Sequence, residues 1–307
     1  MTVIGINIKS PPSDADLTAV RDSGATQVRI GWEPAWGLQG LTDAIRKIHS
    51  YGLSIMLCLT PHTREYTEPG FPQFNNQAAR LLREGDVLEH YNAGNHKPFA
   101  KTPSAKAYAQ CFHDCRAEVM KLTDPPPMIL GGMSPESGIL SPPTFLVDMI
   151  NQGPKTEGIP TVLLADGFGI HPYCFPSDPR LADSWNPVTH LDKIHDIFNF
   201  CGKGNMPIHI TEFGSPSALS GYHIGTADPK YPQLPYRYSP EYQAEWLIYY
   251  MQAFSNCRAN LASYIWYTLN DGPKVFTNWD GHMGLRKADG TRKPVSSVFR
   301  AIAWTSR

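Results

Sequence analysis

Short apolar runs alternate with amphipathic segments along the whole chain. Leu53–Leu59 is apolar almost throughout, which is typical of a strand covered on both faces. Asp14–Ser23 has helical spacing of its apolar residues and stops at Gly24. The predicted strands are Val3–Ile6, Gln27–Ile30, Leu53–Leu59, Asp86–Tyr91, Met128–Leu130, Phe168–Ile170, Ile208–Thr211 and Ser263–Tyr267, and the predicted helices are Asp14–Ser23, Leu41–Ser50, Asn75–Arg83, Ser104–Leu122, Thr144–Asn151, Leu191–Phe200, Pro240–Cys257 and Val295–Trp304.

Eight strand–helix pairs predict an α/β protein with a (β/α)8 barrel, also called a TIM barrel. The chain carries no internal repeat and no low-complexity linker, so we expect residues 1–307 to form a single catalytic barrel domain. The rival is an open, doubly wound sheet. That fold favours a glycine-rich phosphate turn after the first strand, and Asn7–Pro12 is not such a turn.

Composition narrows the classes of partner. The 307 residues contain 27 Lys and Arg against 28 Asp and Glu, so the net charge is -1 and no basic excess exists to neutralise a nucleic acid. Charged residues make up 18% and aromatic residues 11% of the chain, which favours uncharged ligands that stack on rings, sugars among them. We expect a carbohydrate partner, and neither a nucleic acid nor a membrane.

Targeting and redox signals are weak. The first ten residues lack a basic region followed by an apolar stretch, and no run approaches the length of a membrane span. The six cysteines form no CxxC pair, which favours free buried thiols over a zinc site or a disulfide set. Localisation stays open between the cytoplasm, a phage particle or lysis system, and a trimmed secreted domain. The chain is expected to be a monomer or a domain of a larger protein.

In a (β/α)8 barrel the chemistry gathers at the carboxyl ends of the strands. Reading those ends in order brings one arginine, one glutamate, one or two histidines, one tyrosine and one tryptophan to a single mouth, with Trp32 and Asn92 also at strand ends. No metal-ligand spacing accompanies them, so neither a metal nor a cofactor is expected. The candidate residues are Arg29, Trp32, Asn92, His171, Tyr173, Glu212 and Trp266.

This set suits chemistry on a sugar. Glu212 would be a nucleophile or base that Arg29 and Tyr173 hold in its ionised form, and Trp266 would offer a flat apolar floor to a sugar ring. A carboxylate that attacks an anomeric carbon needs a second carboxyl group, about 5–5.5 Å away, as acid and base.

Several stretches, in order along nearly the whole chain, resemble clan A glycoside hydrolases and especially their family 39-like branch. The resemblance implies that Glu212 is the nucleophile, that Asn92 binds the sugar 2-hydroxyl, and that Trp266 floors the −1 subsite. It also implies a retaining, double-displacement hydrolysis of O-glycosidic bonds. The stretches that carry it are Val28-Arg29, Glu89–Asn95, Gly131–Pro135, Asp166–Tyr173, Ile210–Gly214, Tyr264–Tyr267 and Gly284–Pro294.

One position departs from the family pattern. The fourth strand of the clan ends in Asn-Glu, whose glutamate is the acid/base, whereas this chain has Asn92-Ala93. Because the rest of the site is intact, we favour an engineered Glu-to-Ala replacement that traps substrate. A natural pseudo-enzyme that only binds glycans is the alternative class. A third hypothesis makes Glu136 the acid, although the turn around it resembles the family's fifth-strand turn. Glu89 is expected to be a buried structural acid.

The substrate is expected to be an oligosaccharide or polysaccharide, with cell-wall glycan among the candidates. Sequence does not decide the sugar, the linkage, or endo against exo action. A long loop from Ser215 to Tyr238 would wall a cleft. Aromatic residues in the predicted top-face loops could stack on further sugar units: Trp32, Trp36, Phe175, Trp185, Tyr222, Tyr231, Tyr236 and Trp279.

Overall fold

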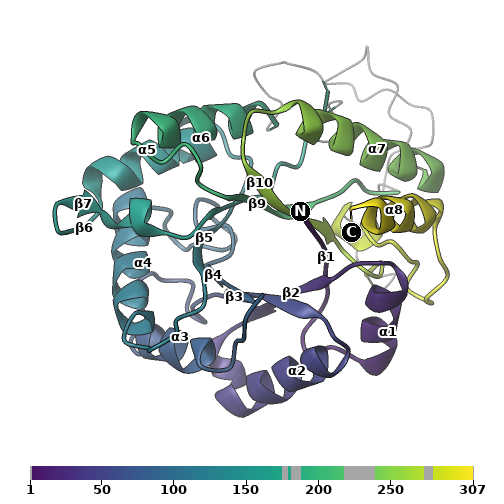
Figure 1. Ribbon diagram of the computed structural model, residues 1–307, viewed down its shortest axis with the longest axis horizontal. Coiled ribbons are helices and arrows are strands. Elements are labelled where there is room, and N and C mark those ends of the chain that lie inside the picture. The colour runs from purple at the N-terminus through teal and green to yellow at the C-terminus, as the bar shows by residue number, and fades with distance from the viewer. Residues whose placement is uncertain (1, 175–178, 181–187, 218–238, 273–278, 307) are drawn as a thin grey trace.

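The chain folds into a closed barrel of eight parallel strands (Figure 1). The computed structural model describes residues 2–174, 179–180, 188–217, 239–272 and 279–306. Around the barrel the strands follow the order β1-β10-β9-β8-β5-β4-β3-β2, so the first and last strands pair and close it. The barrel strands are β1 (Val3–Asn7), β2 (Gln27–Trp32), β3 (Ser54–Leu59), β4 (Val87–His90), β5 (Met128–Met133), β8 (Phe168–Ile170), β9 (Ile208–Phe213) and β10 (Leu261–Tyr267).

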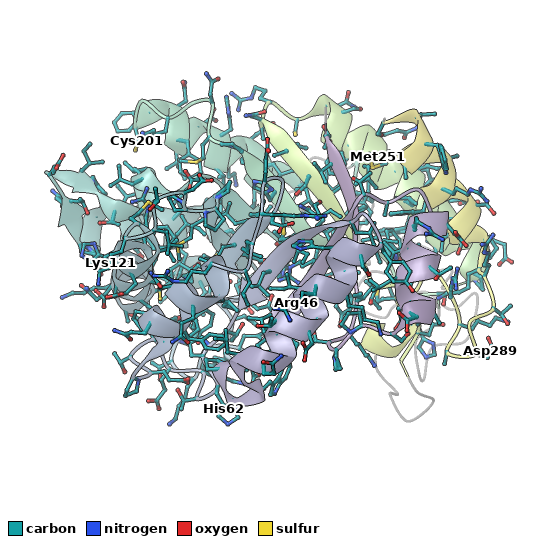
Figure 2. All side chains as sticks on the ribbon, turned by 60° about the horizontal axis from the view of Figure 1, so that its bottom comes forward. Arg46, His62, Lys121, Cys201, Met251 and Asp289 are labelled. Carbon is teal, nitrogen blue, oxygen red and sulfur yellow. The ribbon has the colours of Figure 1, made fainter. Side chains whose placement is uncertain are left out.

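Helices form a ring outside the barrel (Figure 1). In α2 the apolar residues Leu41, Ala44, Ile45 and Ile48 recur at helical spacing and are buried, while Arg46 points outward to solvent (Figure 2). Among the described residues, no helix is long and apolar enough to cross a bilayer. The α-helices are α1 (Asp14–Asp22), α2 (Leu38–Ser50), α3 (Phe71–Ala79), α4 (Ala105–Val119), α5 (Pro142–Gln152), α6 (Val188–Phe200), α7 (Pro240–Asn256) and α8 (Pro294–Thr305).

The predicted (β/α)8 barrel is confirmed, and the predicted strands coincide with observed ones. The main helix difference is α3, which begins at Phe71 rather than Asn75, because Gly70 takes a left-handed conformation and Pro72 suits a first helical turn. The sequence analysis also missed the small antiparallel hairpin of β6 (Lys155–Thr156) and β7 (Ile159–Pro160). Short 3-10 helices cover Pro34–Trp36, Gly138–Leu140, Thr161–Leu164 and Trp279–His282.

The apolar core has two separate parts. Between barrel and helices lies a large apolar cluster that includes most of the buried Leu, Ile and Phe side chains. A smaller cluster joins Met56, Ile129 and Ile265, on three different barrel strands. Successive strand residues point to opposite faces, so Arg29 and Met56, which are register partners on β2 and β3, share the inner face. Toward the carboxyl ends of the strands, the inner face carries buried polar residues, Arg29 and Glu89 among them. These residues form a polar layer next to the small apolar cluster.

Candidate active site

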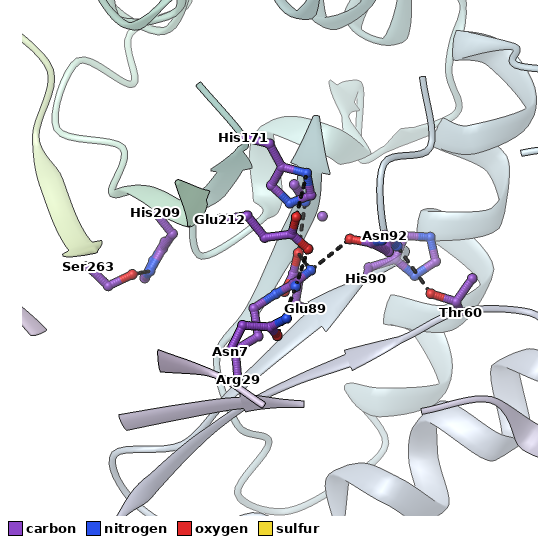
Figure 3. A network of polar contacts seen from close by, with 12 residues as sticks. Asn7, Arg29, Thr60, Glu89, His90, Asn92, His171, His209, Glu212 and Ser263 are labelled. Carbon is purple, nitrogen blue, oxygen red and sulfur yellow. Dashed lines mark hydrogen bonds and ion pairs between the residues drawn. The ribbon is translucent and has the colours of Figure 1, made fainter. Parts of the chain in front are cut away.

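Arg29 of β2 is the centre of the polar layer (Figure 3). Its Nε and Nη2 donate to the two carboxylate oxygens of Glu89 at 2.6 and 3.0 Å. Its Nη1 donates to Oε1 of Glu212 at 2.6 Å, and Nη2 also donates to Oδ1 of Asn92 at 2.8 Å. One guanidinium thus connects three side chains that come from β4, the turn after it, and β9.

Glu89 anchors this arrangement from below. It is fully buried and also accepts a hydrogen bond of 2.9 Å from the backbone N–H of Gly132. Burial disfavours the charge of Arg29, but the carboxylates of Glu89 and Glu212 outweigh it and hold the pKa of the guanidinium well above its ordinary value. Glu89 therefore orients Arg29 and, being fully buried, does not line the cavity described below.

Glu212 sits at an irregularity of β9. Between the register pairs Ile210–Tyr264 and Phe213–Trp266, β9 advances by three residues and β10 by two, so one extra residue bulges in β9. The carboxylate of Glu212 accepts from Arg29 and, at its Oε2, from the hydroxyl of Tyr173 at 2.9 Å. Its side chain keeps 12% of its surface exposed, toward the cavity.

His171 lies beside Glu212 as a neutral ring. Its Nδ1 is 3.7 Å from Oε2 of Glu212, and its buried Nε2 has no hydrogen-bond partner among the described residues. Burial, and then the charge of Arg29, lower the pKa of His171 to about 3, so the ring carries no charge near neutral pH. A β-carbon at Gly132 would lie 2.0 Å from this Nε2, so the glycine makes room for the ring.

Asn92 is placed to meet a ligand. Its backbone N–H donates to the Thr60 hydroxyl at 3.3 Å, and its Oδ1 is held by Arg29. That contact fixes the amide so that its NH2 group stays available as a donor, and Asn92 lines the cavity.

The cavity itself measures about 800 Å³, which is the size of a typical small-molecule site. Six of the predicted site residues line it together: Arg29, Trp32, Asn92, His171, Tyr173 and Glu212. The ring of Trp32 packs edge-to-face with that of Trp36, at 5.5 Å between centroids. Aromatic walls around polar groups suit a sugar, whose C–H faces stack while its hydroxyls bond.

Trp266 is not where the sequence predicts it. The side chain is fully buried, its Nε1 donates to the backbone O of Met283 at 3.1 Å, and its ring packs edge-to-face against Phe213. Strand alternation explains the difference, because Ile265 belongs to the apolar cluster of the barrel strands and Trp266 must face the helices. The next residue, Tyr267, lines the cavity and takes the aromatic position predicted for Trp266.

Ala93 follows Asn92 in the turn after β4. It adopts a left-handed backbone conformation with φ of 49° and is 1% exposed. Its N–H donates to the backbone O of Gly132 at 2.9 Å, and its own carbonyl accepts from the N–H of His96. The methyl group cannot transfer a proton, and Ala93 is absent from the cavity lining.

Two further carboxylates line the cavity, and each is paired with a histidine. Glu136, in the loop after β5, is hydrogen-bonded to Nδ1 of His96. Glu33, just after β2, is 2.9 Å from Nδ1 of His62. The sequence analysis considered Glu136 only as an alternative and did not select Glu33. Both glutamates follow the carboxyl end of a strand, and that position could have identified them. Nothing in the sequence, however, pairs them with these histidines.

Some predictions fall outside the described residues. They concern the side chains of Phe175, Trp185, Tyr222, Tyr231, Tyr236 and Trp279, and most of the loop from Ser215 to Tyr238. Within the part of the chain that the structure describes, no group of three His, Cys, Asp or Glu residues is arranged to hold a metal ion.

A parallel eight-stranded barrel, with a cavity of polar and aromatic residues at its carboxyl end, defines the chain as a (β/α)8 barrel protein of the kind that many enzymes share. No family model matches the chain, and no curated protein matches it. The fold is similar to a β-xylosidase from Caulobacter crescentus CB15, with 13% identity, a TM-score of 0.69 and coverage of 98% of this chain and 67% of that one.

Two other solved structures have the same architecture. A family 39 glycoside hydrolase from Bacteroides cellulosilyticus WH2 shares 17% identity at a TM-score of 0.64, over 98% of this chain and 63% of that one. A β-galacturonidase from Eisenbergiella tayi shares 16% at 0.62, over 98% and 50%. The chain thus spans between half and about two thirds of the length of these glycoside hydrolases. At such identities the likeness shows a common fold.

Proposed function

We propose that the chain is a retaining glycoside hydrolase that cleaves O-glycosidic bonds of an oligosaccharide or polysaccharide, with Glu212 as the nucleophile. The observation that carries the proposal is the carboxylate of Glu212, fixed by Arg29 and Tyr173 at the wall of a cavity of about 800 Å³. The glycosidase fold of the structural neighbours supports it.

The reaction has two steps. An oxygen of Glu212 attacks the anomeric carbon while the bond to the leaving oxygen breaks and an acid protonates that oxygen. Water then attacks the glycosyl ester, gives a proton to the same acid group acting as base, and frees the Glu212 carboxylate. The NH2 group of Asn92 would donate to the sugar hydroxyl beside the anomeric carbon, and Trp32 and Tyr267 would pack against the ring.

The role of Glu212 can be tested separately from the proton donor. Glycosides with a very good leaving group, such as 2,4-dinitrophenol, need little protonation, so they report on the nucleophile. The panel consists of the dinitrophenyl β-xyloside, β-glucoside, β-mannoside, β-glucuronide and β-galacturonide. We expect slow release of dinitrophenol from one of them, and a release rate at least about 10³-fold lower in Glu212→Gln. The same rate in both proteins would contradict the nucleophile assignment.

A second candidate is a carbohydrate-binding protein without catalysis, which Ala93 favours because it replaces the acid/base of the resembled family. In that case the unaltered chain and Glu212→Gln would both bind a glycan in calorimetry, and neither would release dinitrophenol from any glycoside. Under the hypothesis of a Glu-to-Ala replacement, Ala93→Glu would raise turnover of poor leaving groups by about 10²–10⁴-fold.

A further inference from the structure

We propose that Glu136, paired with His96, is the acid/base of the proposed reaction in place of residue 93. The inference rests on the proposed glycosidase function and deepens it. It gives the chain as it stands a complete pair of carboxyl groups and makes Ala93 compatible with turnover.

Glu136 reaches the same cavity as Glu212. Both residues line it, and the Glu136 side chain is 30% exposed, so a bound sugar can contact it. Glu136 lies in the loop after β5, and β5 is the barrel neighbour of β4, whose terminal turn holds Ala93. The carboxylate therefore comes from the strand end next to the position where the resembled family carries its acid.

The loop that bears Glu136 is fastened to the turn that bears Ala93. Asn95 is fully buried, and its Nδ2 donates to the backbone carbonyls of Ser134 and Leu140, each at 2.8 Å. Its Oδ1 accepts from the N–H of Ser134, also at 2.8 Å. One side chain thus joins the two loops by three hydrogen bonds. Such fixation is what a proton donor needs if it is to keep a constant place relative to Glu212.

His96 orients the carboxyl group. Its Nδ1 is hydrogen-bonded to Glu136, and its backbone N–H donates to the carbonyl of Ala93 at 2.9 Å. His96 also lines the cavity. The His96–Glu136 pair therefore belongs to the wall of the same cavity as His171 and Glu212.

Glu33 is the competing carboxylate. It also lines the cavity and pairs with His62. However, His62 does not line the cavity, and Glu33 follows β2 beside the Trp32–Trp36 ring pair, where a sugar would stack. Glu33 therefore lies beside the ring pair, whereas Glu136 follows the strand next to β4, whose terminal turn holds Ala93.

The proton balance is complete with groups present in the chain. In the first step the proton of the Glu136 carboxyl group moves to the leaving oxygen as the C1–O bond breaks and the Glu212–C1 bond forms. In the second step Glu136 takes a proton from water as that water forms its bond to C1 and Glu212 leaves. The reaction needs no further reactant.

The test compares phenyl and 2,4-dinitrophenyl glycosides of the sugar that the panel identifies. Glu136→Gln should lower the rate for the phenyl glycoside by about 10²–10⁴-fold and that for bond cleavage in the dinitrophenyl glycoside by less than about tenfold. Glu118→Gln on α4, outside the cavity, is the control for general effects of losing a carboxylate. Azide, a small nucleophile that needs no base, should accelerate Glu136→Ala and form a glycosyl azide of retained configuration.

Other outcomes overturn the inference. An equal loss for both leaving groups, or the leaving-group pattern in Glu33→Gln instead, would show that Glu136 is not the donor. If azide accelerates the unaltered chain, or if a phenyl glycoside is cleaved only after Ala93→Glu, then the proton donor that is missing belongs at residue 93. Either result would be compatible with Glu212 as the nucleophile. If neither the unaltered chain nor any variant cleaves a dinitrophenyl glycoside, the proposed function is wrong as well.

Discussion

At the residue scale, Arg29 balances two buried or nearly buried carboxylates with one positive charge. Glu89 takes two of its N–H donors and so turns the guanidinium to offer Nη1 to Glu212. Taking charges out of water is costly, and only well-matched hydrogen bonds offset the cost. The cluster therefore serves to position Glu212 more than to stabilise the fold.

Removing one member of the cluster should be costly. Glu89→Gln leaves Arg29 with less negative charge in a buried site, and we expect a loss of about 3–5 kcal/mol in the free energy of unfolding. Urea unfolding followed by circular dichroism measures it. The matched control is Glu65→Gln, which breaks the exposed pair with Lys101 at 2.6 Å and should leave the free energy of unfolding nearly unchanged. Similar losses in both variants would contradict the buried-cluster interpretation.

At the element scale, bulges shape the site. Between the register pairs Leu130–Phe168 and Met133–Ile170, β5 advances by three residues and β8 by two, and β9 has the comparable shift at Glu212. Both irregularities lie at the carboxyl ends of strands that flank β8. Bulges redirect side chains next to active sites. The irregular stretch of β5 contains Gly132, and that of β9 contains Glu212.

Gly132 should not tolerate a side chain. An added β-carbon would lie 2.0 Å from Nε2 of His171 and 2.3 Å from Oγ1 of Thr211, both buried, so Gly132→Ala must displace the histidine beside Glu212 or the threonine. We expect a loss of about 1–3 kcal/mol in stability together with weaker glycoside binding. Gly31→Ala is the control for stability, since a β-carbon at Gly31 meets nothing within 4 Å. A fully stable Gly132→Ala protein would contradict this view.

Alternation along β10 was the part of the local pattern that sequence analysis misjudged. Short apolar runs do not reveal which of two adjacent aromatic residues faces inward, because strands covered on both faces are apolar throughout. Once Ile265 is known to share a cluster with Met56 and Ile129, Trp266 must point to the helices and Tyr267 to the cavity.

At the scale of the whole molecule, buried neutral histidines should make stability depend on pH. Burial lowers the pKa of His171 to about 3 and that of His209 to about 4, whereas an unfolded histidine titrates near 6.5. Between these values the unfolded chain binds more protons, so stability rises with pH and falls as pH drops below about 6.5. Each such histidine contributes about 1.4 kcal/mol per pH unit in that window.

The contribution of one histidine can be isolated. His209→Gln removes a group in the barrel whose Nδ1 is 3.0 Å from the Ser263 hydroxyl, and we expect the slope of unfolding free energy against pH, between pH 6 and 4.5, to fall by about one proton. Urea unfolding at a series of pH values gives the slope for both proteins. Equal slopes would mean that His209 is protonated in the folded chain.

The sequence alone determined the elements and the barrel, because periodicity and helix stops are local properties of neighbouring residues. It also brought Arg29, Asn92, His171, Tyr173 and Glu212 to one end, since the carboxyl ends of parallel strands meet there. Tertiary structure alone decided the pairing of Glu136 with His96, the replacement of Trp266 by Tyr267, and the seclusion of Ala93. These features depend on which face of a strand points into the barrel and on contacts between loops far apart in the chain, neither of which can be read from a short stretch of sequence.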